Sequence, residues 1–509
     1  MKLDVVNNTK RNLIFGVLNR VIVLICPFLT RAIIQYYLGE AYLGLGSLFS
    51  AILTVLSLSE LGISSAIIYN MYKPVAENDT ETVCALLNFY RKVYAVIGAV
   101  ILGIGLLLIP FLPRLISGGY PDTINLTALY LIYLGNTVIS YFLFGYMSSL
   151  IVVYQREDVN SITNLIVTLV LNALQILALV LFQNYYLYSL LMPVFTVVNN
   201  LRIAYIARKM FPQYTCRGTV SKELVADIKV RVTGAFINKV CLVSRNALDS
   251  ICISAFLGLA LTAIYNNYYY ILMGISSIMA MVGTSIQGGI GNHVALKRKE
   301  ENYQELKKLD FLYKWITTWC AVCLLCLFQP FMELWMGHGM MLPMPAVALL
   351  SLYFYLLEMS GIRNIYSSAC GLWWHHRYRS VAEAVCNVVL NIVLGKFFGI
   401  YGIILATIIT IVCLDFFWGN HIIFKHYFGV EKESGYLRGQ LEYFAVMVLL
   451  CGITYLLCGW LSVENLYGTM AIRMAVCVSV PNAIWLALFH KREEFAYLFT
   501  VLNSFRKKR

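Results

Sequence analysis

Charge is scarce in this 509-residue sequence. Charged residues make up 13% of the chain and hydrophobic residues 60%, and the mean hydropathy is +0.72. A water-soluble domain of this length could not keep so much apolar surface away from solvent. The composition therefore excludes a soluble protein and indicates a chain that lies mostly within a membrane.

The sequence also lacks the motifs and the long polar segments of an enzyme. It contains no P-loop, no HExxH zinc pattern and no GxSxG nucleophile pattern. The longest outside loops that we predict, 112–124 and 333–344, are too short to fold into a catalytic unit. Most of the 14 cysteines lie in apolar stretches, where we interpret them as reduced packing residues. We therefore predict a protein that is not an enzyme, with no catalytic residue, no metal site and no cofactor.

Long apolar stretches are what the sequence has in abundance. About 20 apolar residues cross a bilayer as a helix, whereas a transmembrane barrel needs short strands of alternating polarity. Fourteen continuous stretches qualify, at approximately residues 12–36, 42–69, 90–112, 124–153, 161–182, 185–207, 232–256, 261–291, 312–332, 345–373, 380–399, 402–424, 441–460 and 468–490. The fold class is therefore an all-α polytopic membrane protein with about 14 transmembrane helices.

Lysine and arginine are distributed unevenly between the two sides of these spans. With the N-terminus inside, the inside segments together with the inner ends of the spans carry 30 of the 39 Lys and Arg, Lys314 and Arg379 among them, and the outside loops carry only Arg114 and Lys396. Cytoplasmic loops are enriched in Lys and Arg. We therefore predict that both termini are cytoplasmic and that the first span is retained. The net charge of +13 then reflects topology, and no nucleic acid is expected as a partner.

The chain repeats itself at an offset of 219 residues. The matching segments are Leu38-Gly39 with Leu257-Gly258, Asn19 with Asn238, Val170-Leu171-Asn172 with Val389-Leu390-Asn391, and Gly118 with Gly337. Each repeat holds six spans, and an even number gives both repeats the same orientation. We predict two parallel six-helix repeats around a central cavity, followed by two C-terminal helices. The predicted parts are an N-terminal bundle 1–210, a cytoplasmic linker 211–231, a C-terminal bundle 232–425, and two extra helices with a basic tail 426–509.

Cations within the spans are the candidate substrate-binding residues. Arg20 and Arg31 lie on the first span, and Lys239 and Arg245 lie on its repeat partner. A charge at the centre of a membrane helix costs roughly 2.5–3.5 kcal/mol and normally faces a bundle interior or a wet cavity. A cavity with surplus positive charge suits a phosphate or diphosphate, which Arg and Lys bind well. The alternative is structural pairing with the few acids inside spans, which are Glu60, Asp249, Glu358, Glu383 and Asp415.

Polar stripes at aligned positions of the two repeats are the second candidate feature. They contain Asn164 and Asn172 in the first repeat, and Asn387 and Asn391 in the second. They either line the cavity or make hydrogen bonds between helices, as polar residues in membrane bundles commonly do. Asp249 and Glu383 are acids on the predicted cavity faces, and both are candidates for ion coupling. Asp249 can instead neutralise Arg245 at i, i+4.

The chain resembles Wzx-type polysaccharide flippases of the multidrug/oligosaccharidyl-lipid/polysaccharide exporter superfamily. The resemblance covers about residues 10–425 and rests on Leu38-Gly39 with Gly44, on its repeat from Asp249 to Leu257-Gly258, and on the segment Glu60-Leu61-Gly62-Ile63-Ser64-Ser65-Ala66. It implies a carrier that moves an undecaprenyl-diphosphate-linked oligosaccharide across the bacterial inner membrane, for O-antigen, capsule or exopolysaccharide synthesis. The expected partners are that substrate, membrane lipids and a polysaccharide polymerase, and the expected state is a monomer working by alternating access.

Three other functions remain open from the sequence. A lipid II flippase also has 14 spans and arginines in the first span. A multidrug cation antiporter of the same superfamily typically has a carboxylate in span 1, and residues 12–36 contain none. A membrane polysaccharide polymerase or glycosyltransferase belongs to a different class, and it would be expected to have larger outside loops and no repeat at 219.

Overall fold

The computed structural model describes residues 5–57, 63–226, 228, 247–461, 463 and 465–495. These residues form helices and connecting turns, and no β-strand occurs among them. Contacts divide the chain into two units, Met1–Ala263 and Ile264–Arg509. The boundary falls inside α10 (Leu259–Leu296), later than the predicted linker 211–231. The two units are defined by which helices pack together, and the repeats by which segments are similar in sequence. The predicted repeat boundary therefore stays a prediction.

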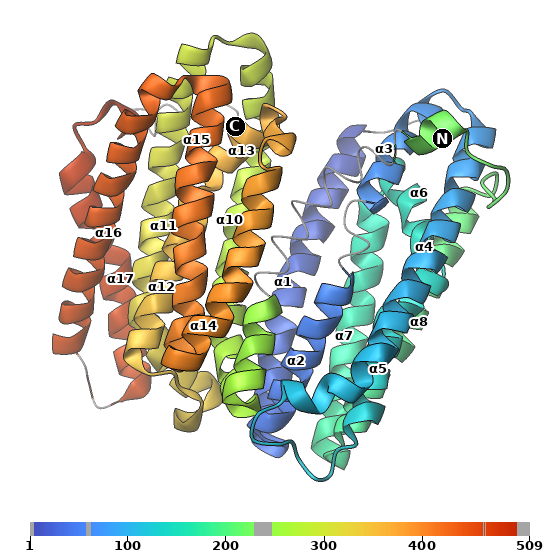
Figure 1. Ribbon diagram of the computed structural model, residues 1–509, viewed down its shortest axis with the longest axis horizontal. Coiled ribbons are helices and arrows are strands. Elements are labelled where there is room, and N and C mark those ends of the chain that lie inside the picture. The colour runs from blue at the N-terminus through green and yellow to red at the C-terminus, as the bar shows by residue number, and fades with distance from the viewer. Residues whose placement is uncertain are drawn as a thin grey trace. The chain divides into compact units, whose positions relative to one another are not determined.

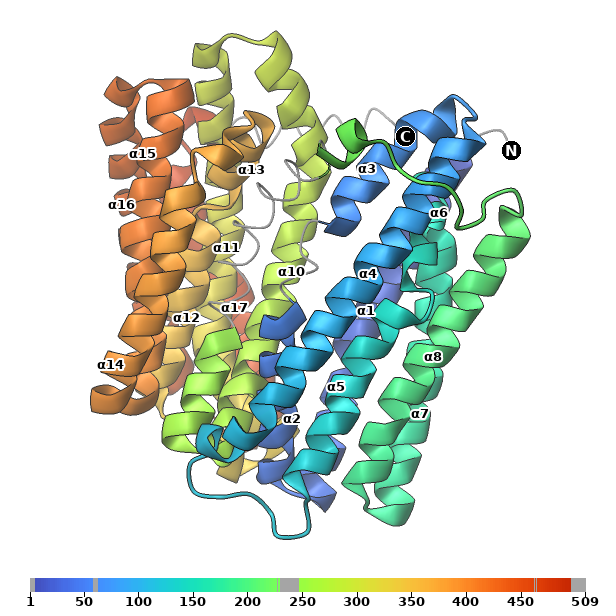
Figure 2. The same ribbon diagram turned by 45° about the vertical axis from the view of Figure 1, so that its right-hand side comes forward.

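The first unit is a bundle of long helices, coloured blue to teal in Figures 1 and 2. Its elements are α1 (Val5–Tyr37), α2 (Glu40–Leu56), α3 (Ile63–Ala76), α4 (Thr80–Leu108), η2 (Ile109–Leu115), α5 (Leu126–Phe142), η3 (Gly145–Met147), α6 (Ser148–Val153), α7 (Glu157–Phe182) and α8 (Tyr185–Met210). Side chains cap several of these helices, as when Asn125 accepts a hydrogen bond from Ala128 N at 3.0 Å, which satisfies a backbone donor that has no helical partner.

The starts of α1 and α7 are fastened together by a buried carboxylate. Asp158 is fully buried and pairs with Arg156 at 2.9 Å and with Arg11 at 2.9 Å. Asn12 accepts a hydrogen bond from Asp158 N at 2.7 Å and donates one to Gln155 O at 3.0 Å. These contacts hold α1, which carries Arg20 and Arg31, against α7, which carries Asn164 and Asn172 of the first polar stripe.

The second unit contains the helices from α10 onward, coloured light green to red in Figure 1. Its elements after α10 are α11 (Lys299–Met336), η4 (His338–Met340), α12 (Met344–Met359), α13 (Gly361–Ala369), η5 (Leu372–Trp374), α14 (Arg377–Thr410), η6 (Ile411–Trp418), α15 (Gly419–Ile423), η7 (Phe424–Phe428), η8 (Val430–Lys432), α16 (Glu433–Trp460) and α17 (Leu466–Phe489). The longest, α11, packs along α12, α16 and α17 and so forms the centre of this unit.

Nine described helices are long and apolar enough to cross a membrane, and eleven if each of two bent pairs is one span. One of the nine, Arg377–Phe428, has 52 residues, which is about 78 Å of helix and more than twice a bilayer's apolar thickness. It turns back at Gly399, whose φ is 56° and ψ −133°, and the Gly402 backbone lies against that of Leu394. It therefore holds both predicted spans 380–399 and 402–424.

The remaining difference from fourteen spans falls at two places. The predicted span 42–69 corresponds to α2 and α3, which are separated by residues outside the described part. Most of the predicted span 232–256 also lies outside it, and only Ala247–Leu257 is described there. The all-helical polytopic fold is confirmed, and the count of fourteen stays consistent with it.

The repeat has a counterpart in the backbone. Gly39 N donates to Ile34 O at 3.0 Å, and Gly258 N donates to Ile253 O at 3.1 Å. The donors of the two bonds are 219 residues apart in sequence, and so are the acceptors. Gly39 and Gly258 have φ of 94° and 91°, a conformation that side chains with a Cβ rarely adopt. Each closes a helix with a six-residue C-terminal turn and begins the next one, which explains why the Leu-Gly pair recurs.

Candidate functional site

Arg31 lies among tyrosines inside the first unit. Its side chain is half-buried, and its charge acts on the phenols of Tyr133, Tyr185 and Tyr188. The Tyr133 and Tyr185 hydroxyls are hydrogen-bonded at 3.0 Å, and the Tyr185 and Tyr188 rings stack at 5.4 Å. Phenol oxygens and ring faces both favour a nearby guanidinium, so the sequence keeps this cation inside the bundle with a polar aromatic shell.

The other three predicted substrate-binding cations are placed less fully. Arg20 lies on α1 and is exposed. Lys239 and Arg245 lie outside the described residues, and so does any i, i+4 pair of Arg245 with Asp249. Asp249 itself is 1% exposed, on the helix Ala247–Leu257. The roles of all four cations, and of Asp249, stay predictions.

An amide-lined cavity of about 640 Å³ lies between α5, α7 and α8 of the first unit. Five asparagines line it, namely Asn136, Asn160, Asn164, Asn199 and Asn200, together with hydroxyl residues and one acid, Glu157. We call it the amide cavity. Its volume is in the range of small-ligand sites, and its lining is polar although it lies within apolar helices.

The amides of this cavity are only partly satisfied by the protein. Asn136 accepts from Thr196 at 2.7 Å, and Asn160 donates to Glu157 at 3.0 Å. The side-chain carbonyl oxygens of Asn160 and Asn199 are buried and have no hydrogen-bond partner among the described residues. A buried acceptor without a partner is costly. Because neither oxygen is open to the cavity in this conformation, each amide must rotate before it can accept from a ligand there.

The polar stripes divide between two kinds of environment. Asn164 lines the amide cavity, whereas Asn172 is not among its lining residues and donates to Thr168 O of its own helix at 2.7 Å. Asn387 and Asn391 are fully buried. Asn391 donates to Asn387 at 3.2 Å, and Asn387 donates to Thr407 at 3.1 Å, so these amides join the two arms of α14.

Four charged side chains of the second unit form a connected network of ion pairs. Arg363 binds Asp415 at 3.0 Å, Arg379 binds the same carboxylate, and Arg379 also binds Glu383 at 3.2 Å. Arg363 is 1% exposed and donates further to the carbonyl of Asp415 at 2.6 Å. We call these four residues the ion network; it contains two cations and two acids. Glu383, a predicted coupling residue, therefore has a cationic neighbour.

A second buried ion pair lies at the start of the predicted span 312–332. Lys314, counted from the sequence on the cytoplasmic side, is fully buried inside α11 and pairs with Asp310 at 3.5 Å. Its ammonium also donates to Met359 O, and Asp310 accepts from Gln440. The i, i+4 spacing of Asp310 and Lys314 was the available signal, but their burial depends on α12 and α16, which lie far along the chain.

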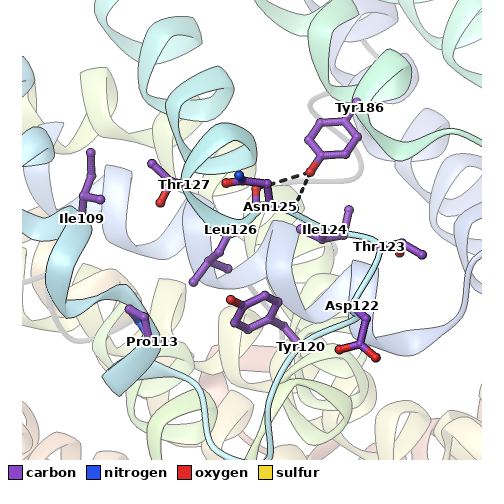
Figure 3. A pocket seen from close by; sticks show the side chains of 10 residues that line it. All are labelled: Ile109, Pro113, Tyr120, Asp122, Thr123, Ile124, Asn125, Leu126, Thr127 and Tyr186. Carbon is purple, nitrogen blue, oxygen red and sulfur yellow. Dashed lines mark hydrogen bonds between the residues drawn. The ribbon is translucent and has the colours of Figure 1, made fainter.

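A second, open cavity of about 550 Å³ lies where η2 leads into α5. Figure 3 shows the Tyr186 hydroxyl directed at the backbone of Asn125, whose N–H donates to it at 2.5 Å. Among the described residues that line it, Asp122 is the one with a charged side chain. The predicted outside loop 112–124 therefore lines an open, polar cavity that has one charged side chain among its described lining residues.

Comparisons with known proteins agree with this architecture. Among solved structures, a lipid II flippase, MurJ, in an inward closed conformation is 14% identical, with a TM-score of 0.68 over 94% of this chain and 99% of that one. An inward-facing multidrug resistance MATE family transporter is 13% identical, with a TM-score of 0.60 over 78% and 93%. A mutant of the Vibrio cholerae MATE transporter VcmN is 12% identical, with a TM-score of 0.58 over 86% and 99%.

The fold is thus that of a polytopic membrane protein, shared with the lipid II flippase and with the MATE transporters. A family model described as polysaccharide biosynthesis protein matches residues 9–286, which is more than half of the chain, and the protein belongs to that family. No curated protein matches the sequence. The resemblance drawn from the sequence is confirmed.

Proposed function

We propose that the protein is a flippase that moves a polyprenyl-diphosphate-linked oligosaccharide across the bacterial inner membrane by alternating access. The family match over residues 9–286 is the observation that carries the proposal. Two features of the first unit support it: cations on α1 that suit a diphosphate, and an amide cavity that suits sugar hydroxyls. Hydroxyls donate and accept hydrogen bonds, as amides do. The five asparagines can therefore bind sugar hydroxyls, and as neutral groups they do not require a charged ligand.

Lipid II is the second candidate substrate. The likeness to a lipid II flippase over 94% of this chain favours it at the level of fold. The amides, which would serve any hydroxyl-rich head group, do not separate the two substrates. The family description is what favours an oligosaccharide for surface polysaccharide.

The cations can be tested by export in a strain that lacks its own flippase. The variants are Arg20→Gln, Arg31→Gln, Lys239→Gln and Arg245→Gln, with Arg114→Gln on the outer loop as the matched control. We expect the four variants to abolish surface polysaccharide while membrane abundance stays near that of the unmodified chain. Arg20→Lys should be damaging if the guanidinium binds in a bidentate manner and mild if only charge matters. Export that survives all four changes would remove the diphosphate role.

The substrate can be identified in proteoliposomes that contain either a polyprenyl-diphosphate-linked oligosaccharide or lipid II. Translocation of the first and not the second is the expected result. The reverse result would assign the lipid II function, and translocation of neither would contradict a flippase of either kind.

The proposed topology places both termini and the linker in the cytoplasm. A membrane-impermeant maleimide should label a cysteine at Arg114 from outside, and cysteines at Arg217 and Gly435 only after the membrane is opened. All three positions are exposed, and Arg217 is preferred to Gly218, whose φ of 82° disfavours a side chain. The unmodified chain measures background from native thiols. Outside labelling at 217 or 435 would contradict the topology.

A further inference from the structure

Three cysteines from three helices meet inside the second unit. Cys326 of α11, Cys458 of α16 and Cys477 of α17 have their sulfur atoms all within 4.8 Å of one another. Their exposed fractions are 1%, 1% and 0%. Cys326 and Cys458 are 132 residues apart in sequence, so the cluster is a product of tertiary packing.

Further sulfur surrounds the three thiols. Cys323 and Cys451 are partly buried and pack against the same apolar core. The Cys451 thiol contacts the Met447 sulfur at 3.7 Å. Cys320, Cys323 and Cys326 follow one another at three-residue spacing on α11, so each is next to the following one on the helix surface.

The spacing of the three sulfur atoms matches a thiolate metal site. Zinc–sulfur bonds are about 2.3 Å long, so three sulfurs around one ion lie roughly 4 Å apart. Small side-chain rotations within the observed 4.8 Å limit would bring all three into that geometry.

A guanidinium lies beside the cluster. Arg473 of α17 donates to Cys326 O at 3.3 Å, and its charge acts on the thiols of Cys458 and Cys477. Its Nε is buried and has no hydrogen-bond partner in the described part of the chain. A divalent ion with three thiolates carries one net negative charge, which Arg473 balances. Three neutral thiols, or a disulfide between two of them, would leave this partly buried cation without that counter-charge.

We propose that Cys326, Cys458 and Cys477 bind one thiophilic divalent metal ion, such as Zn²⁺, with Arg473 as the counter-charge. Binding releases the three thiol protons and requires no electron transfer. The ion would join α16 and α17 to α11 and so stabilise this part of the unit.

Metal content of the purified full-length chain tests the proposal. After dialysis against EDTA and reloading with Zn²⁺, we expect about one Zn²⁺ per chain by mass spectrometry. The triple variant Cys326→Ala, Cys458→Ala and Cys477→Ala should lose it. The control triple Cys26→Ala, Cys386→Ala and Cys413→Ala removes three cysteines outside the cluster and should keep it. Equal zinc in both triple variants, or none in the unmodified chain, would overturn the site.

Two further measurements do not depend on whether the triple variant folds. Co²⁺ loaded into the unmodified chain should give the intense sulfur-to-cobalt charge-transfer absorption of thiolate ligands, and its absence would overturn the site. Arg473→Gln should weaken zinc binding by about 10-fold, as loss of groups beyond the ligands does, and Arg473→Lys should restore it. A mass two daltons lower under non-reducing conditions would show a disulfide and contradict metal binding.

Discussion

The two units place their polar groups differently. In the first unit, neutral amides surround a cavity, and the carbonyl oxygens of Asn160 and Asn199 have no protein donor among the described residues. In the second unit, Arg363, Arg379, Glu383 and Asp415 pair with one another in the ion network. Neutral amides beside a cavity can rotate to bind a ligand, whereas paired charges hold helices together. The two units therefore use polar side chains differently, although the helix-ending bonds at Gly39 and Gly258 are the same.

Breaking the ion network should give the largest effect on stability. Arg363→Met leaves Asp415 with one cation instead of two and should destabilise the second unit by up to roughly 3 kcal/mol, less than the loss of a sole partner would cost. Thermal unfolding of the purified protein in detergent measures the loss. The matched control is Arg377→Met, an exposed arginine. The double variant Arg363→Met with Asp415→Leu should recover much of the stability because Arg379 keeps Glu383, and no recovery would show that the pair is not coupled.

Removing single amides from the cavity should affect transport rather than stability. Asn160→Leu or Asn199→Leu each removes an acceptor worth about 1 kcal/mol to a bound donor, so transport efficiency should fall by roughly 5- to 10-fold. Asn172→Leu is the control, because its amide bonds to its own helix. Transport by proteoliposomes measures the change. An equal fall in the control variant would assign the effect to packing and not to the cavity.

Neutralising the coupling candidates should change the dependence of transport on ion gradients. Asp249→Asn and Glu383→Gln should each lower flux under an imposed proton or sodium gradient and leave flux without a gradient nearly unchanged. Glu383 pairs with Arg379, so a coupling role for Glu383 requires that this ion pair opens during transport. Measuring the two variants separately shows which acid is coupled. Flux that is insensitive to both gradients and to membrane potential in the unmodified chain would make the protein a passive facilitator.

The smallest effect should come from the helix cap at Asp79. Its carboxylate accepts from Thr82 N at 3.0 Å, and the hydrogen bonds from Thr82 hold the pKa of Asp79 below its usual range. A folded-state pKa below the unfolded value contributes stability at higher pH, which is lost as pH falls through the folded pKa. Asp79→Ala should therefore lower Tm slightly at pH 7, with a smaller difference near pH 3. Asp79→Asn should keep most of the cap, and a constant difference across pH would contradict the assignment to charge.

The sequence by itself determined the membrane environment, the approximate spans and the repeat. These depend on local properties: an apolar run of sufficient length must be a helix in lipid, and a Leu-Gly pair that ends one helix and begins the next needs glycine at a positive φ. Gly39 and Gly258 therefore have the same backbone bonds 219 residues apart.

Only the tertiary structure decided which polar side chains meet. Lys314, assigned from sequence to the cytoplasmic side, is buried beside Asp310. Arg363 finds Asp415 across 52 residues, and Cys326, Cys458 and Cys477 gather from three helices. Hydropathy fixes how deep a residue lies in the membrane, but pairing also depends on how each helix is rotated and packed against partners distant in sequence. The rotation of a helix cannot be predicted from a single charge or thiol. A small rotation of the helix about its axis gives that side chain different neighbours.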